Sequence, residues 1–316
     1  MTSEAGVSLR SVASGAGVAG PARIGRRLVQ GNALPVLTVV AALVVIWYAG
    51  AVWLNAPWAY DQAGRAGVEL GPVDLVAATW FQDRPRLPAP HQVGAELWRT
   101  TMEVAPTSRR SLVYHAWITL SATAVGFGLG ALLGVVLAAS IVLNRAMDAS
   151  VMPWVIASQT IPILAIAPMI IVVLASLGVT GLMPKAVISM YLSFFPVAVG
   201  MVKGLRSPEP MLMDQMRTWN ASTSQTFWKL RWPAAVPYLF ASLKVGVAAS
   251  LVGAIIGELP TGAVAGLGAR MLSGSYFGQT VQIWSALVMA AILAACLVGA
   301  VGLVERLTKR AMGVVA

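Results

Sequence analysis

Charged side chains are scarce in this chain. Only 11% of its 316 residues are Asp, Glu, Lys or Arg, whereas 58% are hydrophobic, and the mean hydropathy is +0.76. Soluble domains usually carry about 25% charged residues. This scarcity argues against a soluble enzyme or binding domain and favours a protein whose surface faces lipid.

Cysteine, histidine and phosphate-binding motifs are also rare or missing. Cys296 is the single cysteine, which excludes an internal disulfide and a thiolate metal site, and we expect it to be buried. The two histidines, His91 and His115, have a spacing that suits neither a metal site nor a Ser-His-Asp set. We expect His91 to lie in an exposed loop and His115 at an interface. The sequence lacks G-x-x-x-x-G-K-[ST], which cradles ATP phosphates. We therefore expect no catalytic residues, no cofactor and no metal on this chain.

Six apolar segments are long enough to cross a bilayer, which takes about 20 residues. Each is predicted to be a helix, because an unpaired backbone cannot cross lipid. The segments are residues 34–54, a run within 111–143, 151–177, 186–202, 238–256 and 281–304. The sequence therefore predicts an all-α integral membrane protein with about six transmembrane helices.

Basic residues gather on alternate loops. With the N-terminus inside, the inside loops hold 13 basic residues against five acidic ones, whereas the first outside loop holds six of each. The inside basic residues are Arg10, Arg23, Arg26, Arg27, Arg145, Lys203, Arg206, Arg217, Lys229, Arg231, Arg306, Lys309 and Arg310. This positive-inside pattern predicts a multi-pass protein of the inner (plasma) membrane with cytoplasmic N- and C-termini. It accounts for the net charge of +10 without a nucleic-acid partner.

The glycines of the second apolar segment favour packing over ligand binding. Gly126, Gly130 and Gly134 recur every four residues in the middle of a predicted span. A small residue at each fourth position lets two helices approach closely in a membrane. We therefore predict that these glycines form a helix-packing face.

A polar, basic segment, DQMRTWNASTSQTFWKLRWPAAVP, separates two apolar runs at residues 214–237. Asn220 readily takes the left-handed conformation that ends a helix. Ser222 and Gln225 fit the S-x-x-Q capping box that begins one. The segment is therefore predicted to be a rigid helix–turn–helix, which favours a docking element over a slack linker.

The same segment carries signals for the end of its second helix. Lys229 and Arg231 are expected in the last turn, where cations suit the helix dipole. Pro233 and Pro237 are expected to stop the helix before the next apolar run.

This segment resembles the coupling loop of ABC importer permeases, whose consensus is E-A-A, three residues, G, nine residues, I-x-L-P. Aligned on the proline, Asp214 takes the Glu place, Asn220 the Gly place, and Leu230 the Ile place. The resemblance extends over about 111–310 and is strongest with permeases for nitrate, sulfonates, taurine and pyrimidine precursors. It assigns ATPase coupling to Asp214, Gln215, Met216, Asn220, Ala221, Leu230 and Pro233.

The resemblance implies a type I ABC importer permease without its own ATPase site. The implied partners are an ABC ATPase subunit that binds the ATP, an external solute-binding protein, a second permease copy forming a homodimer, and the lipid membrane. Residues 257–262 and 275–284 look most like permeases for pyrimidine or flavin-type vitamin precursors, so the expected cargo is a small organic solute. A sulfonate, taurine or nitrate importer is the alternative. A secondary transporter is less favoured, because only Lys244 and Glu258 are available as ionisable relays.

Three polar residues near the spans are candidates for the substrate pathway or gate. Glu258 lies near the outer end of the fifth apolar segment, where it is either a solvated interfacial carboxylate or part of the gate. Gln159 and Thr160 either satisfy the backbone near Pro162 and Pro168 or contact cargo. Both alternatives stay open for each residue.

The chain is accordingly divided into five parts. They are a disordered basic cytoplasmic tail (1–33), a first transmembrane helix (34–54), an external loop containing an interfacial helix at 92–102 (55–110), a permease core with its coupling loop at 206–235 (111–310), and a cytoplasmic C-terminus (311–316).

Overall fold

The structure is a computed structural model that describes residues 33–260 and 265–313. Of the predicted tail (1–33), only Ala33 is described, and of the predicted C-terminus (311–316), only residues 311–313 are described. The other residues of both parts lie outside the described residues. The chain divides into two units, residues 1–50 and 51–316, which are described separately.

The first unit, as far as it is described, is the beginning of helix α2 (Ala33–Ala66). Its side chains are mostly apolar and exposed, as a lipid-facing helix requires. The predicted first span, 34–54, lies within α2. The helix continues past the predicted end as far as Ala66, with Pro57 inside it.

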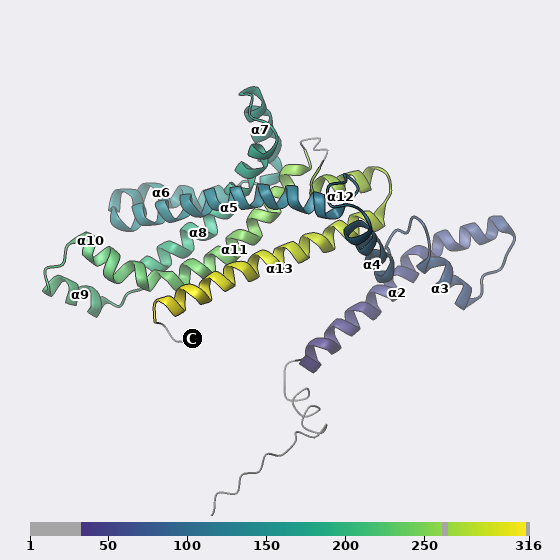
Figure 1. Cartoon of the computed structure of the whole chain (residues 1–316), viewed down its shortest axis with the longest axis horizontal. Coiled ribbons are helices and arrows are strands. Elements are labelled where there is room, and N and C mark those ends of the chain that lie inside the picture. Colours follow the sequence, from purple (N-terminus) through teal and green to yellow (C-terminus); the bar gives the residue numbers. More distant parts are fainter. Residues whose placement is uncertain (1–32, 261–264, 314–316) are drawn as a thin grey trace, which may run out of the picture. The chain divides into compact units, whose positions relative to one another are not determined.

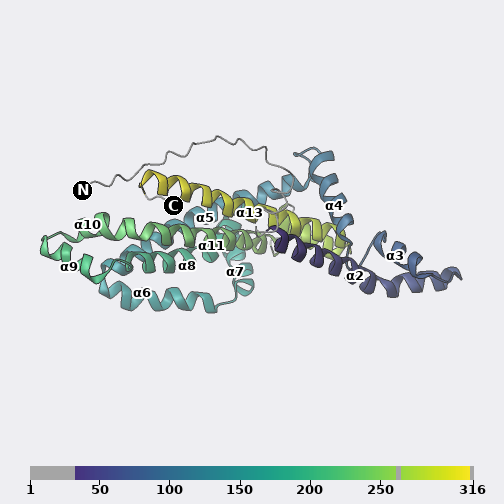
Figure 2. The same ribbon diagram turned by 90° about the horizontal axis from the view of Figure 1, so that it is seen from below.

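The second unit is built on four long helices that run side by side in both views (Figures 1 and 2). They are α5 (Leu112–Leu143), α8 (Leu182–Leu205), α11 (Trp232–Glu258) and α13 (Thr280–Ala311). Helix α8 packs against both α5 and α11 and is the most buried of the four. The unit's core is therefore the seam between α8 and its two neighbours.

The predicted packing face on α5 is confirmed. A Cβ added to Gly134 would lie 2.8 Å from the Phe194 carbonyl oxygen and 2.9 Å from the Ala198 nitrogen, both on α8. Gly126 and Gly130 face α8 in the same way. These contacts are with backbone atoms, so a side chain at Gly134 would force the two helices apart.

Two serine hydroxyls join the same three helices. Ser189 on α8 donates to the Ser250 carbonyl on α11 over 2.5 Å, and Ser250 donates to the Thr123 carbonyl on α5 over 3.0 Å. All three residues are fully buried. Paired polar groups of this kind stabilise helix association in lipid by about 0.6 kcal/mol each.

The third predicted span, 151–177, is not one straight helix. It consists of α6 (Arg145–Ala157), the 3-10 turn η2 (Ser158–Thr160) and α7 (Ile163–Ser176), and the two helices meet at 102°. A residue before proline is driven out of the helical region, and Ile161, before Pro162, has an extended ψ of 121°. Among the described residues five helices can cross a membrane, or six if this bent pair forms one span.

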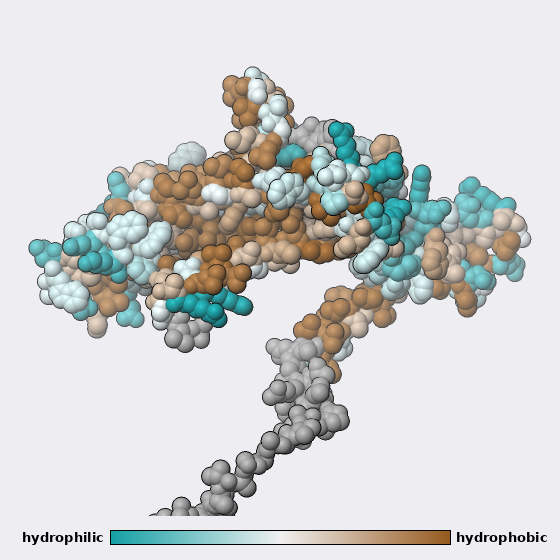
Figure 3. Space-filling model, viewed as in Figure 1, coloured by the Kyte–Doolittle hydropathy of each residue, from teal (hydrophilic) through white to brown (hydrophobic). Residues whose placement is uncertain are grey.

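Shorter helices lie at the end of the unit away from α9 and α10 (Figure 1). They are α3 (Pro72–Trp80), α4 (Pro90–Trp98), the π-helical turn η1 (Arg99–Glu103) and α12 (Leu267–Tyr276). The predicted helix at 92–102 corresponds to α4 and η1, and its place at the membrane interface stays a prediction. Hydrophobic side chains cover the middle of the helical unit, and hydrophilic ones gather at both ends (Figure 3).

Two expectations for single residues are wrong. Cys296 is exposed, because the face of α13 that carries it has no helix against it within the described chain. His91 lies on α4 rather than in a loop, half-buried with its ring centroid 5.2 Å from that of Phe81.

The packing face gives a stability prediction with a matched control on the same helix. Gly134→Ala should destabilise the protein by about 1–3 kcal/mol, because the added methyl group meets the backbone of α8. Gly128→Ala should be nearly silent, since no atom lies within 4 Å of a Cβ built there. Thermal unfolding of the purified protein in detergent measures both, and equal losses would contradict the packing-face assignment.

Candidate functional site

The predicted coupling segment is a helix–turn–helix, as its local signals indicate. Helix α9 (Pro210–Thr218) ends at a turn in which Asn220 has a φ of 52°, the only positive φ of a non-glycine residue in the described chain. The Asn220 amide donates to the Arg217 carbonyl and the Ala221 amide to the Met216 carbonyl, both over 2.9 Å. The predicted left-handed conformation of Asn220 is therefore confirmed.

The predicted capping box is also confirmed. Helix α10 (Thr223–Thr226) begins at Ser222, whose hydroxyl accepts from the Gln225 amide over 3.2 Å. The Gln225 side chain accepts from the Ser222 amide over 2.9 Å. These bonds fix the direction in which the second helix leaves the turn.

The prediction that Pro233 and Pro237 stop this helix is wrong. The chain is helical without interruption from Thr223 to Glu258. The π-helical turn η3 (Phe227–Arg231) precedes Trp232, whose amide donates to the Phe227 carbonyl five residues back. This wider turn places Pro233 in the first turn of α11, where a missing amide donor is tolerated. Lys229 and Arg231 consequently lie within a long helix and not in the last turn of a short one.

The segment is anchored to the helical core through Phe227 and Arg231. Phe227 is buried in a cluster with Met201 and Leu205 of α8. Arg231 donates to the Leu205 carbonyl over 3.2 Å. This cluster ties the segment to the same helix on which the core is built.

An open hollow of about 450 Å³ lies between α9 and the second helix of the segment. Of the seven predicted coupling residues, Gln215, Met216, Ala221 and Leu230 line it together, beside the exposed Trp219. Asp214 is exposed on α9 and pairs with Arg217 over 2.9 Å. The hollow has the chemistry to receive an apolar side chain with charged groups at its rim.

A second polar region lies at the other end of α11, around Glu258. The Glu258 carboxylate accepts from the Thr119 hydroxyl over 2.9 Å and from the Gly268 amide over 2.8 Å. Its side chain is fully buried, so the alternative of a solvated interfacial carboxylate is wrong. The reason is tertiary, because α12 folds back over the end of α11 and excludes water.

Lys185 is the cation of this region, and sequence reasoning missed it. Its Nζ lies 3.8 Å from Glu258 Oε1 and donates to the Ala265 carbonyl over 3.3 Å. The fourth span was predicted to begin at residue 186, whereas α8 begins at Leu182 and includes the buried Lys185. A lysine directly before an apolar run was the only signal.

Two side chains of α5 hold the start of α12 against this pair. His115 Nδ1 accepts from the Gly266 amide over 3.0 Å, and its Nε2 therefore donates to the Arg109 carbonyl over 2.9 Å. Thr119 Oγ1 accepts from the Leu267 amide over 2.8 Å. Gly266 has a φ of +130°, and an added Cβ would collide with the Glu258 carboxylate. Only glycine therefore permits this close approach.

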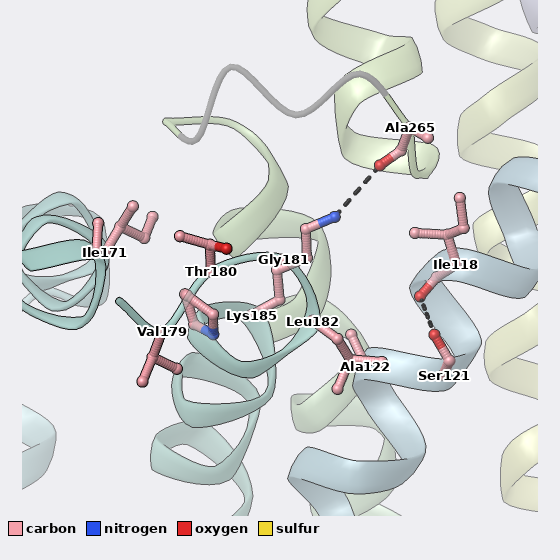
Figure 4. A pocket seen from close by; sticks show the side chains of 12 residues that line it. Ile118, Ser121, Ala122, Ile171, Val179, Thr180, Gly181, Leu182, Lys185 and Ala265 are labelled. Carbon is pink, nitrogen blue, oxygen red and sulfur yellow. Dashed lines mark hydrogen bonds between the residues drawn. The ribbon is translucent and has the colours of Figure 1, made fainter. Parts of the chain in front are cut away.

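A cavity of about 560 Å³ opens beside Lys185 (Figure 4). Its wall is mostly apolar and comes mainly from three helices, with Ile118 and Ala122 of α5, Ile171 of α7 and Leu182 of α8, and also from the connection at 179–181 and Ala265. In Figure 4 the Lys185 side chain extends toward the Ala265 carbonyl at the edge of the cavity. The cavity can hold a small, largely apolar molecule close to the Lys185–Glu258 pair.

Gln159 and Thr160 lie elsewhere. Both are exposed on η2, and neither lines the cavity beside Lys185. Thr160 donates to the Ala157 carbonyl over 2.8 Å, which is the backbone role considered for it. Lys244 pairs with Glu305 of α13 over 2.5 Å, near the end of α13 that is remote from Glu258.

Comparison with known proteins gives the family. Residues 130–313 match the family described as "Binding-protein-dependent transport system inner membrane component". The chain is 30% identical to the riboflavin transport system permease protein RibX of Chloroflexus aurantiacus, over 71% of this chain and 80% of that protein. It is 29% identical to the formylaminopyrimidine transport permease protein ThiX of Halalkalibacterium halodurans, over 58% and 68%. It is also 29% identical to the nitrate import permease protein NrtB of a Synechocystis species, over 61% and 66%.

A solved structure supports the fold. The inward-facing MetNI methionine ABC transporter matches with a TM-score of 0.55 and 21% identity, over 62% of this chain and 94% of that one. With its long apolar helices and its predicted coupling segment, this chain belongs to the binding-protein-dependent transport system inner membrane components and is a membrane-spanning permease of the ABC importer type.

Proposed function

We propose that this permease imports a small organic solute without net charge, of the pyrimidine or flavin-type vitamin precursor class. The observation that carries the proposal is the cavity beside Lys185. Its volume of about 560 Å³ falls within the 300–1,000 Å³ typical of small-molecule sites. Its mostly apolar wall suits a flat heterocycle with a few polar atoms.

The balance of charge at the cavity supports this cargo over the alternative one. Among the described residues of the cavity wall, Lys185 is the only charged one, and Glu258 lies 3.8 Å from its Nζ. A sulfonate or nitrate ion would favour a cation free to bind it, whereas this lysine already faces a buried carboxylate. The relatives include permeases named for riboflavin and formylaminopyrimidine, and also one named for nitrate.

Energy for import is proposed to come from a partner ATPase that docks on α9 and the hollow beside it. The rigid turn at Asn220, the capping box and the buried Phe227 give the stiffness that transmits a push. Asp214, exposed at the rim, is the proposed polar contact with the ATPase. ATP is then bound by that partner and not by this chain.

The remaining proposed partners are an external solute-binding protein and a second copy of this chain. Helix α7 supports the second copy, because it leaves the helical unit at the 102° bend (Figure 1). Leu164, Met169 and Val172 on α7 are each more than 60% exposed and form an apolar surface that another copy would cover. The ATPase and the solute-binding protein would then act on opposite sides of a dimer.

Cargo choice is tested first by uptake and then by the Lys185–Glu258 pair. Cells that express this permease with its ATPase and binding protein should take up labelled pyrimidine precursor or riboflavin but not labelled nitrate or taurine.

Glu258→Gln should destabilise the protein by about 3 kcal/mol, because Lys185 then stays buried without its carboxylate. Uptake should fall with it. Adding Lys185→Met should recover most of the stability, since the pair couples non-additively.

Glu305→Gln is the control for this test, because it removes a lysine-paired carboxylate from the other end of the helical unit. It should leave the choice of cargo unchanged. Uptake of nitrate or taurine alone would refute the proposed cargo class. Normal uptake by a well-expressed Glu258→Gln variant would remove Glu258 from the pathway.

Coupling is tested with a charge reversal and a control of matched exposure. Asp214→Arg should weaken copurification of the ATPase by about tenfold or more, because the reversal places a charge of the wrong sign at the proposed contact. Asp61→Arg breaks a similar exposed pair with Arg65 over 2.8 Å and should leave ATPase binding intact. Membrane expression of both variants is measured alongside. Normal ATPase binding by Asp214→Arg would count against the coupling segment.

Orientation is tested by labelling single cysteines in a Cys296→Ser background. Ser224→Cys and Arg310→Cys, both exposed, should react with an impermeant thiol reagent only after the membrane is opened. The exposed Glu69→Cys should react in sealed cells, because its loop carries as many acidic as basic residues. Reaction at Ser224→Cys from outside would invert the proposed topology.

A further inference from the structure

Four arginines surround a hollow at the end of the helical unit opposite the coupling segment. The hollow measures about 800 Å³, and we call it the arginine hollow. Its charged lining residues are Arg84, Arg99, Arg110 and Arg270, with Asp83 and Glu96. Four positive charges thus face two negative ones.

The walls of the hollow are held in place by hydrogen bonds between segments distant in sequence. The Thr280 hydroxyl donates to the Pro85 carbonyl over 2.5 Å and ties the loop before α4 to the start of α13. The Ser111 hydroxyl donates to the Thr100 carbonyl over 3.3 Å and ties η1 to the start of α5. The Gln282 side-chain Nε2 donates to the Arg270 carbonyl over 3.4 Å. The arginines therefore project from a fixed frame.

The guanidinium groups are mostly without carboxylate partners. Arg99 pairs with Glu96 over 2.5 Å. Within the described residues, Arg84, Arg110 and Arg270 form no ion pair. Arg270 is half-buried, and burial lowers the pKa of its guanidinium more than the nearby Glu96 raises it, so burying this charge costs free energy. An anion in the hollow would offset that cost.

The hollow lies where apolar helices begin. Arg110 comes two residues before α5, and Gln282 lies in the first turn of α13. Two tryptophans lie close in sequence to Arg99 and Arg110 of the hollow. They are Trp98 of α4 and Trp117 of α5, and each is more than 60% exposed. Exposed tryptophans are typical of the headgroup layer of a bilayer. These features favour a position of the hollow near the level of the lipid phosphates.

We propose that the arginine hollow binds the phosphate group of an anionic phospholipid. Phosphate oxygens accept paired hydrogen bonds from the fork of a guanidinium, which makes arginine the favoured partner. The hollow is far larger than a free phosphate ion and leaves room for the glycerol part of a headgroup. The acyl chains would lie along exposed apolar side chains of α5 and α13, such as Val113 and Leu287.

The test uses the full-length permease, stripped of lipid in detergent, with added phosphatidylglycerol or phosphatidylcholine. Native mass spectrometry counts the lipids retained, and thermal unfolding measures their effect on stability. Phosphatidylglycerol should be retained in preference to phosphatidylcholine. The double variant Arg84→Gln/Arg110→Gln removes two exposed arginines, so it should fold, and it should bind phosphatidylglycerol about twentyfold more weakly.

A matched control removes the same charge from the same two loops. Arg86 and Arg109 are exposed and lie outside the hollow, so Arg86→Gln/Arg109→Gln should retain the wild-type preference. An equal loss in this control would reduce the effect to general surface charge and overturn the site.

Two further outcomes would also overturn the proposal. If inorganic phosphate alone raises the unfolding temperature as much as phosphatidylglycerol does, the ligand is a soluble phosphate. Alternatively, Arg84→Gln/Arg110→Gln could keep its lipid but lose affinity for the solute-binding protein. The hollow would then be a protein-docking surface.

Discussion

The structure depends on the close backbone contact between α8 and its two neighbours. Gly126, Gly130 and Gly134 bring α5 against one side of α8, and Gly253 brings α11 against the other, where an added Cβ would lie 2.8 Å from Ser189 Cα. Lipid tails are as apolar as leucine, so helices in a membrane gain little from burying apolar surface against each other. Close packing and shared hydrogen bonds have to hold this seam together. Glycine at the contact points permits both, because it lets backbone carbonyls and hydroxyls on neighbouring helices meet.

The same close approach makes a buried ion pair possible at one end of the seam. Lys185 comes from α8 and Glu258 from α11, and both lie next to Gly257, whose added Cβ would be 3.2 Å from Lys185 Cα. A buried charge is tolerated when it is paired and its remaining hydrogen-bonding positions are used. Thr119 and the Gly268 amide occupy those positions on the carboxylate. The pair therefore depends on α5 and α12 as much as on the two helices that carry it.

Sequence reasoning succeeded where the signal was local and failed where it was tertiary. The left-handed Asn220 and the Ser222–Gln225 capping box depend on residues at most five apart, and both were predicted. The proline at position 162 marks where the third apolar segment is interrupted, but the 102° angle between α6 and α7 depends on how α7 packs. Pro233 was misjudged because the π-helical turn before it changes which amide is needed. The burial of Glu258 could not be predicted, since the helix that covers it begins nine residues later and returns against α5.

The continuous helix from Thr223 to Glu258 connects the two candidate regions mechanically. Its 36 residues make a rod of about 54 Å, longer than the roughly 30 Å of hydrocarbon in a bilayer. One end carries the capping box and the buried Phe227, and the other carries Glu258. Hydrogen bonds fasten that second end to α5 and α12, so a tilt started at the coupling segment has to move these helices together. Helix α7 is joined to them through the bend at Pro162 and packs on them only lightly. The cavity beside Lys185 lies between α7 and that body, so a relative movement of the two would change the width of the cavity.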